Sequence, residues 1–311
     1  MSERALSSPP RMLPLFLRAG AALVPGASAL PFIGGAGKQI PDLELVLTDL
    51  EIDRDRLAAY DRVCGFSLRD ELPCTFVHVL AFPLHLALMT DGSFPFPAVG
   101  LVHIENRIIQ HRPVRLGERL SIRVRANELE PHPRGKKFSV LSEARVGQEL
   151  VWEEESVNLR RGGGGKPAPD GAVGSAPAGS ALAEDRSGSA DGADPADELP
   201  VTAEWRLPGD LGRRYAGVSG DHNPIHIHPL TARLFGFPSA IAHGMWTKAR
   251  CLAALESELP DAYTVEVAFK RPILLPGKVS FGEARADGGI SFGVRDAKRD
   301  STHLVGTVRS A

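Results

Sequence analysis

Hydrophobic and polar residues alternate along short runs in both halves of the chain. Residues 120–126 (LSIRVRA) and 263–269 (YTVEVAF) have an apolar side chain at every second position, and residues 146–159 and 288–296 continue this pattern. A period of two predicts strands with one buried face, and the Gly and Asp residues between the runs predict turns. We therefore expect antiparallel β-structure over much of the chain.

One apolar helix is predicted ahead of the strands in each half. The first is centred on residues 82–90 (FPLHLALMT), and the second covers residues 244–259 (GMWTKARCLAALESEL). A helix followed by an antiparallel meander is an α+β pattern, which differs from the alternating strands and helices of a parallel sheet.

Residues 161–200 differ in composition from the rest of the chain. They are mostly Gly, Ala, Pro, Ser and Asp, with hardly any large apolar side chain. Such a segment cannot bury enough surface to offset its ordering entropy, so it is predicted to be a flexible linker. The predicted organisation is an N-terminal arm (1–40), a first domain (41–160), the linker (161–200) and a second domain (201–311).

Bulk composition restricts the class of protein. The 311 residues carry a net charge of -2, which gives no basic excess for a nucleic acid or an anionic membrane surface. The apolar stretch 12–29 is interrupted by Arg18 and by prolines, so we expect a short helix or an arm there, with neither an export signal nor a membrane span. The three cysteines form no CxxC pair, which favours a reducing, cytoplasmic location.

The two halves of the chain are similar in sequence. The similar pairs, in the same order in both halves, are 60–66 (YDRVCGF) with 215–221 (YAGVSGD), 80–84 (LAFPL) with 241–245 (IAHGM), and 112–117 (RPVRLG) with 271–277 (RPILLPG). Together they predict an internal duplication.

The segment 215–232 (YAGVSGDHNPIHIHPLTA) carries the strongest candidate chemistry. Pro224 disfavours a helical conformation at Asn223, so the chain should turn between Asp221 and His226. A turn can bring the carboxylate and the imidazole together around one water molecule. The imidazole can take and return a proton near neutral pH, while the carboxylate accepts hydrogen bonds.

A second element follows at residues 242–246 (AHGMW), directly before the second predicted helix. A backbone N–H at a helix N-terminus can bind developing negative charge, and Gly244 lets a ligand approach closely. An acid/base pair with such a donor suits removal of a proton next to a carbonyl group whose oxygen becomes negatively charged.

These residues resemble the hydratase-2 motif of the MaoC-like (R)-specific enoyl-thioester hydratases. The matching positions are Tyr215, Val218, Ser219, Gly220, Asp221, Asn223, Pro224, His226 and Ala232. Residues 242–245 (AHGM) are similar to the oxyanion segment of that family. The two-copy layout resembles the bacterial (3R)-hydroxyacyl-thioester dehydratases with a double hot-dog fold.

The resemblance implies an α+β double hot-dog, in which two antiparallel sheets each wrap a long central helix and join edge to edge. It implies reversible hydration of trans-2-enoyl thioesters, or dehydration of (3R)-3-hydroxyacyl thioesters, in fatty-acid metabolism. The substrate would be carried on coenzyme A or acyl carrier protein, no metal or other cofactor is required, and a homodimer is compatible with the family.

The resemblance also assigns roles to residues. Asp221 and His226 would be the catalytic pair, and the Gly244 N–H would bind the thioester oxygen. Asn223, Ser219 and His243 would support them. Which member of the pair takes the C2 proton stays open.

The first half lacks the corresponding groups. Phe66 stands where Asp221 stands, no counterpart of His226 follows, and the segment pairing places Pro83, which has no N–H, at the position of Gly244. We therefore expect a non-catalytic domain that completes the sheet and shapes the acyl pocket.

Two alternative functions remain, a hot-dog acyl thioesterase and a non-catalytic acyl-binding protein. Thioesterases of this fold usually carry a lone carboxylate on or near the long helix, and here Glu256 and Glu258 lie only at its far end. A non-catalytic protein would be expected to have lost the motif in both halves.

Several further residues have two interpretations. His222 and His228 are either surface residues or, with His226, metal ligands, and we expect the first because HxH alone is a weak metal signal. Phe94 and Phe96 could line an acyl tunnel or pack in the core. Four basic residues could meet the phosphates of the thioester carrier: Lys248, Arg250, Lys270 and Arg271.

Overall fold

The computed structural model describes residues 2–21, 37, 39–162, 199–286, 288–298 and 301–310. Most of the predicted linker 161–200 therefore lies outside the described residues.

Twelve strands in the described part of the chain form one sheet. The strands before the predicted linker are β1 (Ser2–Leu6), β2 (Leu43–Leu50), β3 (Leu101–Gln110), β4 (Leu120–Ala126), β5 (Glu130–His132), β6 (Gly135–Val146) and β7 (Glu149–Arg161). The strands after it are β8 (Val201–Leu207), β9 (Tyr263–Phe269), β10 (Gly277–Ala286), β11 (Gly289–Asp296) and β12 (Thr302–Ser310). The strand order is β1-β2-β4-β6-β7-β3-β9-β12-β11-β10-β8, and β5 pairs with β6.

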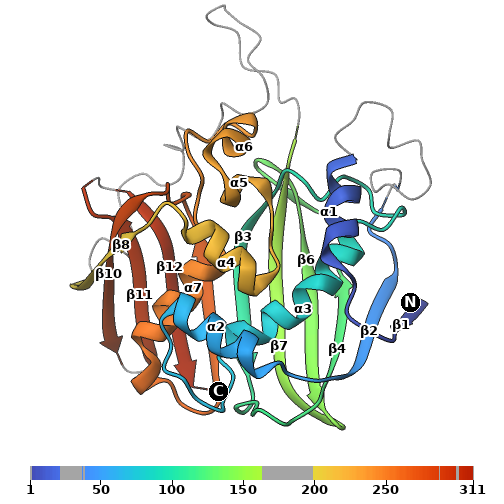
Figure 1. Cartoon of the computed structure of the whole chain (residues 1–311), viewed down its shortest axis with the longest axis horizontal. Coiled ribbons are helices and arrows are strands. Elements are labelled where there is room, and N and C mark those ends of the chain that lie inside the picture. The colour runs from blue at the N-terminus through green and yellow to red at the C-terminus, as the bar shows by residue number, and fades with distance from the viewer. Residues whose placement is uncertain are drawn as a thin grey trace, which may run out of the picture.

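The helices α2, α3, α4 and α7 lie on one face of this sheet (Figure 1). The helical elements are α1 (Met12–Ala21), α2 (Arg54–Cys64), α3 (Cys74–Met89), α4 (Leu211–Ser219), α5 (Pro224–Ile227), α6 (Pro229–Leu234), α7 (Gly244–Ala254) and a 3₁₀ turn (Glu256–Glu258). Among the described residues, no helix is both long enough and apolar enough to cross a membrane.

The two halves have the same topology. The path β2-β4-β6-β7-β3 of the first half matches β8-β10-β11-β12-β9 of the second, and a short helix followed by a longer one precedes β3 and β9. This arrangement confirms the predicted duplication and the α+β class. The strands expected at 120–126 and 263–269 have the predicted bounds.

Pairing between β3 and β9 joins the halves into one sheet. Residues 105–110, the C-terminal part of β3, pair antiparallel with residues 263–268, which are nearly all of β9. On the exposed face of this seam, Arg107 Nε donates to Glu266 Oε1 at 3.0 Å.

The N-terminal segment also joins the body of the protein. Strand β1 pairs in parallel with β2 and forms the edge of the sheet. Helix α1 confirms the short helix expected there, and its Phe16 ring lies edge-on to His222, with ring centroids 6.2 Å apart. The N-terminal segment therefore reaches the second half close to the candidate chemistry.

Equivalent glycines end the short helices of the two halves. Gly65 closes α2 with φ 87°, and Gly220 closes α4 with φ 82°. A left-handed conformation of this kind favours glycine at a helix end. Their equivalence confirms that residues 60–66 correspond to residues 215–221, and that Phe66 takes the place of Asp221.

The predicted correspondence between Pro83 and Gly244 is wrong. The Leu72 N–H donates to Val114 O at 2.8 Å, and the Ala242 N–H makes the equivalent bond to Ile273 O at 2.9 Å. Since these acceptors are equivalent in the two RP segments, Cys74 corresponds to Gly244 as the first residue of its helix.

Pro83 lies inside α3, which begins earlier than expected. Nearly every side chain of α3 is buried, so no polar face marks where the helix starts. Residues 66–73, all of them described, contain no elements equivalent to α5 and α6. The sequence comparison assumed a shorter deletion here and therefore aligned Gly244 with the wrong residue.

The seam gives a prediction about the isolated second half. Residues 200–311 alone would expose the edge of β9 and the apolar surface that the first half covers, and unpaired edges promote association. We expect this fragment to aggregate or to self-pair with impaired activity, as measured by light scattering coupled to gel filtration. A monodisperse, fully active monomer would contradict this prediction.

Candidate active site

A hydrogen-bonded turn holds Asp221 at the end of α4. The Asp221 N–H donates to Ser219 Oγ at 3.1 Å, and Asp221 Oδ1 accepts from the Asn223 N–H at 3.1 Å. Asn223 Oδ1 in turn accepts from the Ile225 N–H at 3.4 Å and caps α5, with Pro224 as the first helical residue. The Asn-Pro step therefore makes the expected turn, and Ser219 and Asn223 both brace it.

His226 is a buried residue of α5 with a defined tautomer. Its Nδ1 lies 2.8 Å from Ile241 O. Because a carbonyl oxygen only accepts, Nδ1 carries the proton and Nε2 keeps a free lone pair. Burial lowers the pKa of His226 below its ordinary value, although the carboxylate of Asp221 opposes this shift. The side chain is thus a neutral base at neutral pH.

His243 packs against this base from the segment before α7. The two imidazole rings are stacked, with centroids 3.7 Å apart and an interplanar angle of 25°. His243 Nε2 donates to Asp221 O at 3.0 Å and lies 3.7 Å from Asp221 Oδ2. Burial, and then the neighbouring His226, lower the pKa of His243 well below its ordinary value. The sequence alone favours a role for His243 only at the entry to the helix. In the structure it also contacts both His226 and Asp221.

The folded chain brings Asp221, His226 and His243 into one group. Their candidate ligand atoms all lie within 4.8 Å of one another, which would suit either a bound water or a metal ion. His222 and His228 do not belong to this group and are exposed. The interpretation of these two histidines as surface residues is confirmed, and His228 caps α6 by accepting from the Leu230 N–H at 3.1 Å.

Helix α7 presents its N-terminus beside this group. It begins at Gly244, and among the described residues no side chain caps it. A Cβ at Gly244 would lie only 3.0 Å from the ring of Phe269, so a side chain here would require that ring to shift. Its first N–H groups are donors for an anionic oxygen. Together with the pair, they provide a base, a carboxylate and an oxyanion donor.

The four basic residues expected near the thioester carrier differ in burial and surroundings. Lys248 is fully buried, so its predicted contact with phosphates is wrong. Arg250 is partly buried and lies 4.7 Å from the centroid of the Trp205 ring. Lys270 and Arg271 are exposed and directly follow Phe269, the residue beside Gly244. For these last two residues, contact with the phosphates stays a prediction.

Phe94 and Phe96 belong to the core of the first half. Both are buried and form an aromatic cluster with Phe138, with ring centroids 5.2–5.5 Å apart. The core-packing interpretation of these residues is therefore confirmed.

The carboxylates at the far end of α7 are engaged elsewhere. Glu256 accepts from the Ser67 N–H at 3.0 Å, and Glu258 pairs with Arg285. The helix itself carries no acidic residue between Gly244 and Ala254. The arrangement typical of hot-dog thioesterases is absent from the described residues of this helix.

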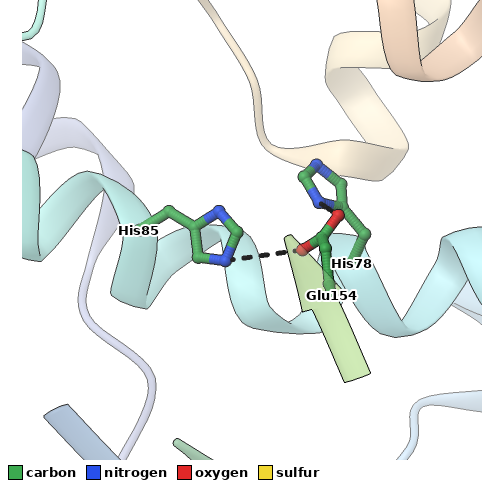
Figure 2. Close-up of side chains that lie close together, drawn as sticks. All are labelled: His78, His85 and Glu154. Carbon is green, nitrogen blue, oxygen red and sulfur yellow. Dashed lines mark hydrogen bonds and ion pairs between the residues drawn. The ribbon is translucent and has the colours of Figure 1, made fainter. Parts of the chain in front are cut away.

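A second cluster of titratable groups lies in the first half (Figure 2). His78 and His85 on α3 flank Glu154 on β7, and all three are buried. His78 Nδ1 donates to Glu154 Oε1 at 2.7 Å, and His85 Nε2 lies 3.6 Å from Glu154 Oε2. The sequence pattern did not single out this cluster, because Glu154 is far from the two histidines in the chain and an apolar helix gives no sign that they meet a carboxylate.

Lys248 connects the cluster to α7. Its ammonium group donates to Asn106 Oδ1, and Asn106 Nδ2 donates to Glu154 Oε1 at 2.7 Å. Burial lowers the pKa of Lys248 to about 8, while Cys74 and Glu154 oppose that shift. Burial alone would raise the pKa of Glu154, but His78, His85 and Asn106 together bring it down to about 2. The donor set of His78, His85 and Glu154 could hold a cation, but Lys248 already balances the carboxylate charge through Asn106.

Two desolvated histidines of the first half, His85 of this cluster and the half-buried His103, predict acid sensitivity. Burial lowers the pKa of His85 to about 4 and that of His103 to about 3. Above those values the unfolded chain binds protons that the folded chain does not, so stability is highest above an unfolded pKa of about 6.5 and falls as pH decreases. Each such histidine contributes a slope of up to about 1.4 kcal/mol per pH unit.

We expect His85→Gln to show a shallower loss of unfolding free energy between about pH 7 and pH 5 than the unsubstituted protein. Urea unfolding at several pH values measures this slope. Identical slopes for His85→Gln and the unsubstituted protein would rule out this contribution of His85.

Comparison with known proteins agrees with the geometry. Residues 190–303 match the model of the MaoC like domain. The chain is 36% identical over 288 residues to 3-hydroxyacyl-thioester dehydratase X of Mycobacterium tuberculosis. The matched region covers 91% of this chain and 94% of that protein. The crystal structure of HtdX from M. tuberculosis superposes with a TM-score of 0.72 at 34% identity and covers 86% of this chain and 100% of that one.

A more distant M. tuberculosis structure, described as a double hot-dog fold, gives a TM-score of 0.50 at 16% identity over 88% of this chain and 96% of its own. It shows the fold alone. The topology and these similarities establish that the chain is a double hot-dog protein and belongs to the MaoC-like 3-hydroxyacyl-thioester dehydratase family.

Proposed function

We propose that this protein reversibly dehydrates (3R)-3-hydroxyacyl thioesters to trans-2-enoyl thioesters. The observation that carries the proposal is the convergence of the His226 imidazole, the Asp221 carboxylate and the uncapped start of α7 at Gly244. Family membership supports the reaction class, since the M. tuberculosis relative is named a 3-hydroxyacyl-thioester dehydratase.

In the proposed mechanism the thioester oxygen accepts a hydrogen bond from the Gly244 N–H. This contact stabilises the negative charge that develops on the oxygen as the C2–H bond breaks. His226 Nε2 takes the C2 proton, because its Nδ1 proton is directed to Ile241 O and its lowered pKa keeps Nε2 unprotonated.

The same imidazolium then donates its proton to the C3 hydroxyl. The C3–O bond breaks, a C2=C3 double bond forms, and the hydroxyl leaves as water. Asp221 accepts a hydrogen bond from the hydroxyl and stabilises the transient charge on His226. One base thus moves one proton along a single face of the substrate, and the reverse sequence hydrates the alkene.

Three neighbours hold these groups in place. Ser219 and Asn223 fix the turn on either side of Asp221. His243 stacks on His226 and donates to the Asp221 carbonyl, which sets the distance between the base and the carboxylate. These residues support catalysis without exchanging protons with the substrate.

The acyl group would be carried on coenzyme A or acyl carrier protein. Exposed Lys270 and Arg271, next to Phe269, supply positive charge for the phosphates of either carrier. A cytoplasmic location fits the three cysteines, which are buried free thiols.

Substitution of either member of the pair tests the proposal. Asp221→Asn and His226→Gln should each lower turnover of a (3R)-3-hydroxyacyl-CoA by at least ~10²-fold, the low end for losing a positioned acid/base group. His222→Gln, an exposed histidine in the same loop, is the matched control and should stay within about twofold of the unsubstituted protein. Absorbance of the enoyl thioester measures turnover, and near-normal rates in a folded Asp221 or His226 variant would refute the assignment.

The first half should contain no second site. Phe66 replaces Asp221, Pro73 occupies the position of His243, and no element equivalent to α5 provides a base. Titration calorimetry of Asp221→Asn with a long-chain acyl-CoA should therefore give one bound ligand per chain. A stoichiometry of two would show that the first half still binds substrate.

A further inference from the structure

The catalytic turn is held by a residue from the other half of the protein. Arg56 on α2 donates from Nε to Val218 O at 2.8 Å and from Nη2 to Ser219 O at 3.3 Å. These carbonyl groups belong to the last two residues of α4. The acceptors lie directly before Gly220 and Asp221, so the arginine contacts the backbone from which the turn departs.

The chemistry of this contact is that of a helix cap. The last carbonyl groups of a helix have no partner within the helix, and a cation near them interacts favourably with the helix dipole. A guanidinium group can donate to two carbonyls at once and so fixes both direction and distance. Arg56 is partly buried, which reduces screening of this interaction by solvent.

The first half contains the equivalent contact in a weaker form. Val63 corresponds to Val218, and its carbonyl accepts from Trp246 Nε1 at 3.0 Å, again from the opposite half. That contact is a single neutral hydrogen bond, and the residue after the following glycine is Phe66. Arg250 of α7 also lies against Gly65, but no hydrogen bond between these described residues joins it to the end of α2. Among the described residues, a guanidinium group donates to both final carbonyls only at the helix that leads to Asp221.

We propose that Arg56 of the non-catalytic half is a positioning residue for Asp221, acting through the C-terminal carbonyls of α4. Ser219 transmits the position, because its carbonyl accepts from Arg56 and its hydroxyl accepts from the Asp221 N–H at 3.1 Å. This inference rests on the proposed dehydratase function. It gives the non-catalytic half a direct part in the geometry of the site.

Three variants test the proposal. Arg56→Met keeps the length of the side chain but removes the donors, and Arg56→Lys restores a cation and one donor group. Arg107→Met is the matched control, since Arg107 also reaches across the seam, to Glu266, but on the exposed face of the sheet. Unfolding curves measured alongside ensure that each variant is assayed fully folded.

We expect Arg56→Met to lower kcat by about 10- to 100-fold, with KM changed by less than about twofold, because a small displacement of a catalytic group affects the transition state more than binding. Arg56→Lys should recover part of the lost kcat, and Arg107→Met should retain it. A folded Arg56→Met with unchanged kcat would overturn the proposal, and so would equal losses in Arg56→Met and Arg56→Lys.

Amide hydrogen exchange gives a readout that does not depend on activity. In Arg56→Met, the amides of residues 219–223 should exchange at least about tenfold faster, while those at the start of α3 stay unchanged. Unchanged exchange at 219–223 would overturn the proposal even if the unsubstituted protein proved inactive. Inactivity of the unsubstituted protein towards every 3-hydroxyacyl-CoA tested would instead contradict the proposed function.

Discussion

The antiparallel pairing of β3 with β9 sets the position of each half relative to the other. It makes a single sheet from two copies of the same topology and places their helices on one common face. As a result, α2 of one half packs against α4 and α7 of the other. The hydrogen bonds from Arg56 to α4 and from Trp246 to α2 both depend on this placement.

Burial of neutral histidines is the second constraint on the site. His226 and His243 are both buried. A charged imidazole there would lose its contact with water, and this lowers the pKa of both side chains. The effect suits a base that must be unprotonated before it meets a substrate proton. The same desolvation lowers the pKa of His85 and His103 in the first half, where the expected consequence is a fold that loses stability in acid.

Local sequence pattern predicted the parts of this protein that depend on local interactions. Alternation located the strands at 120–126 and 263–269, and the Asn-Pro step located the turn between Asp221 and His226. The predicted position of the first central helix was wrong. Helix α3 begins at Cys74, and a helix that is buried on nearly all sides has no polar face to indicate its ends.

The contacts between the halves were not predictable in this way. Lys248 looks like a surface cation in the sequence, yet it is buried because Asn106 and Val265 on the seam supply its acceptors. His243 gives no stronger signal than any residue before a helix, and its contact with Asp221 depends on the path of the intervening loop. Such contacts follow from tertiary packing, to which composition and periodicity are insensitive.

The equivalence of Cys74 with Gly244 also relates the buried basic side chains of the two central helices, α3 and α7. It places His78 on α3 at the position of Lys248 on α7, so the two helices present basic groups to the same seam. The side chains that accept from them, Glu154 and Asn106, both come from the first half, while Lys248 also donates to the Val265 carbonyl of the second half. A buried carboxylate needs nearby cations or donors, and Lys248 meets that need from the helix whose first residue is Gly244. The first half therefore contacts both elements of the candidate site, the end of α4 through Arg56 and α7 through the hydrogen bond from Lys248 to Asn106.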